Sequence, residues 1–211
     1  MRFKDSFKSY LLVTGLGLVA GLLTTLLNLF PYDTLWSLSS IATLFGFWMI
    51  SITLVIYFSS SNKNASINVF LYLASMNFNF YFLQGVLGIF IARFYNAESF
   101  INWGLLNMYN ALALVCSIVS FVLYYWNKEN KLSSFLYALP VSGLVAETIG
   151  VSIYLYNNHT FLFQLIFDSL SLIILGCWFY KKANNKLISR FVAVFVELGK
   201  IKYFQAALFP F

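Results

Sequence analysis

Six apolar stretches divide the chain, and each is long enough to cross a lipid bilayer as a helix. Short polar breaks separate them, such as Phe30-Pro31-Tyr32-Asp33 after the first stretch. About 20 helical residues cover the roughly 30 Å of hydrocarbon in a membrane. The pattern therefore predicts six transmembrane helices, over residues 10–30, 36–58, 67–92, 103–126, 133–156 and 160–180.

The periodicity of these stretches is helical rather than stranded. A membrane β-barrel needs apolar and polar residues to alternate along strands of about ten residues. Apolar residues instead run almost without interruption, as from Leu170 to Tyr180. The stretch 67–92 is long enough to tilt, or to be broken near Asn77–Asn79. We predict an all-α polytopic membrane helix bundle.

The composition supports a membrane protein. Hydrophobic residues make up 61% of the 211 residues and charged residues 9%, whereas a soluble domain carries about 25% charged residues. This excludes a water-soluble fold, a disordered chain and a nucleic-acid-binding domain, in spite of the net charge of +6.

The basic residues predict the orientation in the membrane. With six spans, twelve of the thirteen Lys and Arg residues fall on the side of the amino end, and Arg93 alone falls on the other. Cytoplasmic segments carry the excess of Lys and Arg in membrane proteins. Both termini are therefore expected in the cytoplasm, with the chain in the plasma membrane.

We divide the chain into a six-span transmembrane domain, 1–182, and a basic amphipathic cytoplasmic tail, 183–211. The tail alternates basic residues with apolar clusters such as Val194-Phe195-Val196. Two interpretations remain open: an interfacial helix held by anionic headgroups, and an ordinary basic anchor for the last span.

Two carboxylates fall inside predicted spans, Glu147 in the fifth and Asp168 in the sixth. An ionised carboxylate at the centre of a membrane helix costs about 2.5–3.5 kcal/mol and usually marks a functional site. Helical spacing places Gly143 and Glu147 on one face, and Gln164 and Asp168 on another. The alternative for each carboxylate is a protonated side chain that joins neighbouring helices.

Amide side chains are dense in the third and fourth spans. Buried amides are costly unless paired, so we predict that they line a polar ligand cavity together with the two carboxylates. Interhelical hydrogen bonds, worth about 0.6 kcal/mol each, are the alternative. The candidate residues are Asn77, Asn79, Gln84, Asn107 and Asn110.

Small residues and proline mark two further positions. Gly17 and Gly21 form a GxxxG step in the first span, which permits close contact with another helix, either in this chain or in a partner protein. Pro140 is expected to kink the fifth span shortly before Glu147.

Four tryptophans at predicted span ends are typical of the membrane interface: Trp36, Trp103, Trp126 and Trp178.

The sequence lacks the residues needed for several kinds of catalysis and metal binding. His159 is the only histidine, and no Walker A motif is present. Cys116 and Cys177 both lie in apolar stretches, so neither a disulfide nor a metal-binding cysteine pair is expected. We expect no metal, no cofactor and no enzymatic activity.

In size, span number and orientation, the chain resembles the substrate-binding S subunits of energy-coupling-factor vitamin transporters. Those are small six-span proteins that dock to a partner through small residues of the first span, where this chain has Gly17-x-x-x-Gly21. The stretch Ile67–Met76, with Ala138-Leu139-Pro140, is also similar to uncharacterised small bacterial membrane proteins. The first resemblance implies an outward cavity for a small molecule.

We therefore expect a small-molecule-binding or transport subunit that relies on a partner for energy. Its partners would be the lipid bilayer, a small molecule, and another membrane protein that docks on the first span or the tail. The alternative is a membrane accessory, immunity or scaffold protein that transports nothing.

Overall fold

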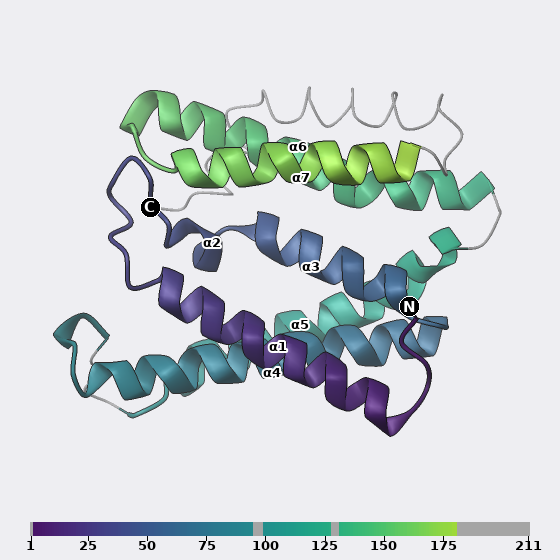
Figure 1. Ribbon diagram of the computed structural model, residues 1–211, viewed down its shortest axis with the longest axis horizontal. Helices are drawn as coiled ribbons and strands as arrows, with labels where there is room; N and C mark the ends of the chain where they lie inside the picture. The colour runs from purple at the N-terminus through teal and green to yellow at the C-terminus, as the bar shows by residue number, and fades with distance from the viewer. Residues whose placement is uncertain (1, 95–98, 128–130, 181–211) are drawn as a thin grey trace. The chain divides into compact units, whose positions relative to one another are not determined.

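The computed structural model describes residues 2–94, 99–127 and 131–180, and every regular element in these ranges is a helix. The predicted tail 183–211 lies outside them. Figure 1 labels the α-helices, and the chain also forms two short 3-10 helices, η1 and η2. In order, the elements are α1 (Phe7–Leu27), α2 (Ser40–Thr43), α3 (Phe45–Phe58), α4 (Asn62–Gly88), η1 (Ala92–Phe94), α5 (Trp103–Leu123), η2 (Tyr124–Asn127), α6 (Lys131–Asn158) and α7 (Leu162–Tyr180).

Polar residues in the breaks start the long helices. The Ser61 side chain accepts a hydrogen bond from the backbone N–H of Asn64 at 3.2 Å. The Asn102 side chain accepts one from the backbone N–H of Leu105 at 3.0 Å. Because the first N–H groups of a helix have no partner within it, such caps fix where α4 and α5 begin.

Four helical segments of the described residues are long and apolar enough to cross a membrane. This confirms the expectation of an integral membrane protein with several apolar helices. The segments are Phe7–Leu27, Trp103–Asn127, Phe135–Asn158 and Leu162–Phe179.

Three of these helices present apolar side chains on their surface, as helices in contact with lipid do. A soluble protein rarely exposes such continuous apolar faces. The exposed residues include Leu11, Leu16, Val19 and Leu23 of α1, Leu114, Ile118 and Val122 of α5, and Leu170, Ile173 and Ile174 of α7.

The predicted second span, 36–58, is not one helix. Leu44 has extended backbone angles, with φ −94° and ψ 160°, and separates α2 from α3. The Leu44 side chain is buried against Val151 and Phe161. This tertiary packing stabilises a break that the apolar sequence itself does not mark.

The predicted third span, 67–92, corresponds to a longer helix that begins earlier. α4 runs from Asn62 to Gly88 without a break near Asn77–Asn79. Its length, about 40 Å at 1.5 Å per residue, is enough to cross a bilayer. It is less apolar than the four segments above because it carries several asparagines.

The chain forms two compact units. Unit 1 comprises residues 1–29 and 54–124, and therefore contains α1, α4 and α5. Unit 2 comprises, among the described residues, 30–53 and 125–180, with α2, most of α3, α6 and α7. The predicted domain 1–182 thus contains two compact units.

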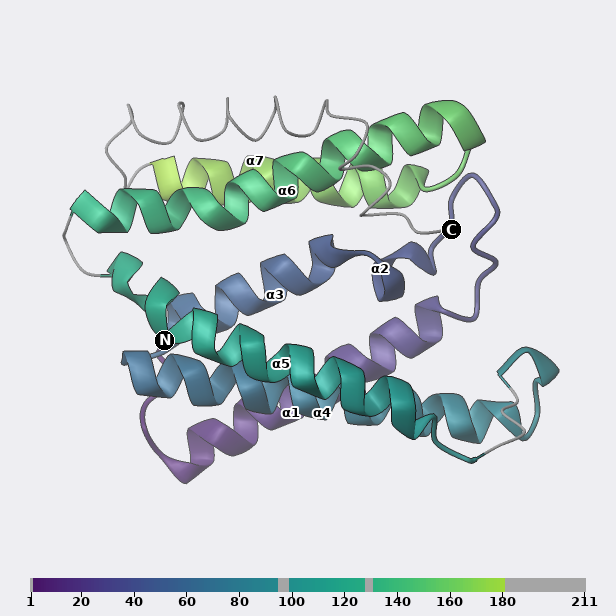
Figure 2. The same cartoon turned by 180° about the vertical axis from the view of Figure 1, so that it is seen from behind.

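In unit 1, α4 lies beside both α1 and α5 (Figures 1 and 2). Polar contacts join α4 to α5. Ser66 Oγ and Ser117 Oγ lie 2.8 Å apart, and Asn62 Nδ2 donates to the carbonyl oxygen of Phe121 at 2.7 Å. Hydrogen bonds of this kind hold membrane helices together where the apolar surroundings offer no other polar partner.

In unit 2, α6 and α7 lie side by side (Figures 1 and 2). Trp126 of η2 stacks on Tyr137 of α6, with 5.6 Å between ring centroids, and Phe179 of α7 packs against both rings. Trp126 is 1% exposed. The indole thus belongs to an aromatic cluster inside the unit, and its predicted place at the membrane interface stays a prediction.

Candidate functional site

Glu147 lies on the face of α6 that packs against the start of α3. One helical turn before it, a Cβ atom on Gly143 would lie 2.9 Å from Met49 Sδ, so glycine permits the close approach of α3. One turn after it, Val151 packs against Leu44. Glu147 itself is 4% exposed. The predicted shared face of Gly143 and Glu147 is confirmed.

The first turn of α3 points toward this carboxyl group. α3 begins at Phe45, directly after the extended Leu44, within an apolar segment. The backbone N–H groups of Phe45 and Gly46 interact with the Glu147 carboxyl, although neither carboxyl oxygen has a hydrogen bond of good geometry. Since a helix start carries a partial positive charge, it favours a carboxylate there.

Asp168 of α7 lies in the same region of unit 2. It is completely buried, as is Gln164 one turn before it. Gln164 Nε2 donates to Asp168 Oδ1 at 2.8 Å, and Ser40 Oγ of α2 lies 3.4 Å from Gln164 Oε1. A Cβ atom on Gly46 would overlap Asp168 Oδ1, so the carboxyl group rests against the backbone of α3. Asp168 Oδ2 has no hydrogen-bond partner.

The two carboxyl groups interact electrostatically and lack a basic partner. The charge of Glu147 acts on the Asp168 carboxyl group. α3 and α7 contain no Lys or Arg, and the one basic residue of α6, Lys131, is at its first position. Both oxygens of Glu147 and one of Asp168 are buried without a hydrogen-bond partner. Burial of an unpaired carboxylate costs several kcal/mol, so this pair is a candidate binding site.

The predicted amide residues all belong to unit 1. Asn77 Nδ2 donates to Asn110 Oδ1 at 3.3 Å and joins α4 to α5. Asn79 Nδ2 donates to the carbonyl oxygen of Leu18 at 2.6 Å and joins α4 to α1. Gln84 is partly buried in α4, and Asn107 is exposed on α5. The single cavity predicted for amides and carboxylates combines residues of both units and stays a prediction.

Gly17 and Gly21 face α4 of the same chain. A Cβ atom on Gly17 would overlap Ser75 Oγ and the carbonyl oxygen of Tyr72, and one on Gly21 would lie 2.5 Å from the carbonyl oxygen of Met76. The glycine step therefore brings the backbones of α1 and α4 together. A partner protein that docks on the first span would have to use another face of α1.

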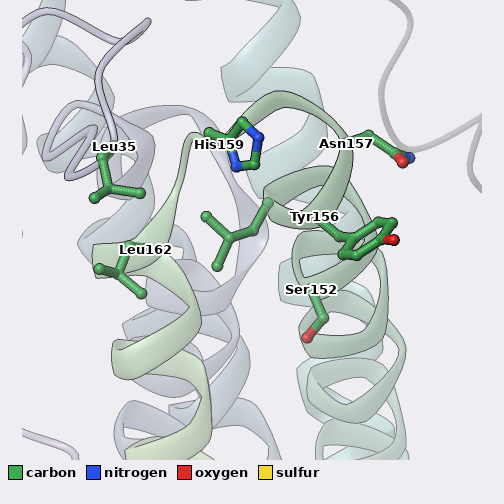
Figure 3. Close-up of a pocket in the computed structure, with 7 residues that line it drawn as sticks. Leu35, Ser152, Tyr156, Asn157, His159 and Leu162 are labelled. Atoms are coloured by element: carbon green, nitrogen blue, oxygen red, sulfur yellow. The ribbon is translucent and has the colours of Figure 1, made fainter.

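A separate open hollow lies where α6 turns into α7 (Figure 3). Its volume is about 780 Å³, and the neighbouring Leu35 is joined to α7 by a hydrogen bond from the N–H of Leu162 at 2.9 Å. His159 has a positive φ of 55° in this turn. The lining residues are Leu35, Ser152, Leu155, Tyr156, Asn157, His159 and Leu162. Because Glu147 and Asp168 are not among them, this hollow and the carboxyl pair are distinct features.

Among the described residues, no three His, Cys, Asp or Glu side chains gather into a group that would hold a metal ion.

Comparison with known proteins assigns no family or function to this chain. No family model, no curated protein and no solved structure matches this chain. The function must therefore be argued from the site itself.

Sequence analysis missed the surroundings of the carboxyl pair. It identified Glu147 and Asp168, but not Ser40 or Gly46, which belong to the broken second span. One signal was present: three serines, Ser37, Ser39 and Ser40, open an otherwise apolar stretch. Their clustering favours an irregular backbone over the start of a long membrane helix.

Proposed function

We propose that this chain is a six-span protein of the plasma membrane that binds a small molecule for transport at Glu147 and Asp168. The observation that carries the proposal is the three buried carboxyl oxygens without a partner. Ionisable groups inside membrane proteins are costly and usually bind substrate, ions or protons. A neutral or cationic molecule with hydrogen-bond donors fits these acceptors best.

The break between α2 and α3 supports the same proposal. Transporters often form their binding sites at helices interrupted within the membrane, where the exposed helix start points at a charged group. In this chain the N–H groups of Phe45 and Gly46 interact with Glu147 in this way. The chain contains no Walker A motif, so we propose that a partner protein supplies energy.

Six spans with both termini in the cytoplasm follow from the distribution of basic residues. The six would be α1, α2 with α3, α4, α5, α6 and α7. In a background with Cys116→Ala and Cys177→Ala, we expect Asn158→Cys to react with a membrane-impermeant thiol reagent added outside cells. Lys63→Cys should react only after the membrane is opened. The reverse labelling would contradict this topology.

Ligand binding is tested by native mass spectrometry of the full chain purified in mild detergent. We expect a co-purified small molecule, and we expect Glu147→Gln to weaken its binding about tenfold or more, because a hydrogen bond to a charged group contributes about 1.5–3 kcal/mol. The exposed Asp33 offers a matched control: Asp33→Asn should bind as the parent protein does. If nothing binds and Glu147→Gln changes no property, the accessory or scaffold function is favoured instead.

A further inference from the structure

The groups around Glu147 and Asp168 are mainly hydrogen-bond donors. The backbone N–H groups of Phe45 and Gly46 interact with Glu147, and the Gln164 side-chain amide donates to Asp168 at 2.8 Å. Donors of this kind stabilise negative charge on a carboxylate. They disfavour Mg²⁺ or Ca²⁺, each of which would also require about six oxygen ligands.

The surroundings of Glu147 and Asp168 limit how many negative charges the two carboxyl groups carry when no ligand is bound. On the elements packed around it, the neighbouring groups are Ser40 of α2, Phe45 and Gly46 of α3, and Gln164 of α7. None of these titrates, and no basic side chain of the described residues interacts with either carboxyl. The hydrogen bond from Gln164 and the N–H groups at the start of α3 favour one negative charge, whereas two adjacent charges in an apolar site repel each other strongly.

We propose that Glu147 and Asp168 together bind one proton, so that the pair carries a single negative charge and not two. For its role in transport, this inference rests on the proposed function, where the proton would leave the site when the small molecule binds. The proton itself is assigned from the geometry of unit 2 alone. The pair is thus a proton site and not a metal site.

Infrared spectroscopy of the full-length protein in lipid nanodiscs at neutral pH tests this inference. The C=O stretch of a protonated carboxyl group is separate from the carboxylate bands and shifts in D2O. We expect a band equivalent to one protonated carboxyl per chain. Added Na⁺, Mg²⁺ or Ca²⁺ should leave it unchanged, and a loss of the band on their addition would overturn the proposal.

The single variants show whether the proton is shared. In Glu147→Gln or in Asp168→Asn, the remaining carboxyl is still buried but no longer shares a proton with a second carboxyl, so the frequency of the band should shift in both. In the double variant the band should disappear. Asp33→Asn, at an exposed position, should retain it. Absence of the band from the parent protein, an unshifted band in either single variant, or persistence of the band in the double variant would overturn the proposal. Circular dichroism verifies that each variant is folded.

The two proposals fail in different ways. If the band is present and no small molecule binds, the pair still holds a proton and the transport function is wrong. If a small molecule binds and the band is absent, the site binds its ligand through two ionised carboxylates and the proton inference is wrong.

Discussion

Gly17→Leu should destabilise the protein by about 3 kcal/mol or more. Even a Cβ atom at this position overlaps the carbonyl oxygen of Tyr72, which belongs to the backbone of α4 and cannot rotate away. The two helices would have to separate, with loss of the hydrogen bond from Asn79 to Leu18. In a thermal unfolding experiment in detergent, we expect the midpoint to fall by roughly 6–12 °C.

Gly15 provides the control for this substitution. It lies on the same helix, but nothing lies within 4 Å of a Cβ atom placed there. Gly15→Leu should therefore unfold at or above the midpoint of the parent protein, since leucine also has a higher helix propensity than glycine. Equal midpoints for Gly17→Leu and Gly15→Leu would show that the glycine step does not hold α1 against α4.

Gly46→Ala should disrupt the carboxyl pair although alanine is the better helix former. The added Cβ atom would overlap Asp168 Oδ1 and lie 2.8 Å from Gln164 Nε2. Asp168 must then leave its place against α3, which moves it away from Glu147. We expect loss of ligand binding and a shift of the protonated-carboxyl band, with a stability decrease of about 1–2 kcal/mol.

The same Gly→Ala substitution at Gly176 should stabilise the protein, whereas at Gly46 it should destabilise it. Gly176 lies in α7, and nothing lies within 4 Å of a Cβ atom there. Gly176→Ala should stabilise the protein by about 0.5–1 kcal/mol through helix propensity, with ligand binding unchanged. If Gly46→Ala behaves like Gly176→Ala, then the contact between Gly46 and Asp168 has no part in the site.

Helix positions were largely predictable because apolar runs of about 20 residues have few other solutions. The break at Leu44 was not, because Leu44 is itself apolar and the nearby Gly46 lies inside α3 and not at the extended position. Leu44 is held by Val151 and Phe161, which lie more than 100 residues further along the chain. Only the packing of those distant residues determines that α3 begins at Phe45.

The charged residues of the candidate site could be predicted from the sequence, but the residues that contact them could not. A carboxylate inside an apolar stretch stands out in any sequence, so Glu147 and Asp168 were found directly. Helical spacing gives the face on which Asn77 and Asn79 lie, but not which helix meets that face. The structure supplies Asn110 and the Leu18 carbonyl oxygen as their partners, and places Gly46 against Asp168.

The contact between α1 and α4 also bears on how the protein is made. Gly17 meets Tyr72, about 55 residues later in the chain, and all of α2 and α3 and the start of α4 are synthesised between them. At about 5–20 residues per second, a ribosome needs roughly 3–10 s to cover that distance. During this interval the glycine face of α1 is open to any other small-residue helix in the membrane. The speed of translation therefore contributes, together with the interface itself, to how faithfully α1 finds α4.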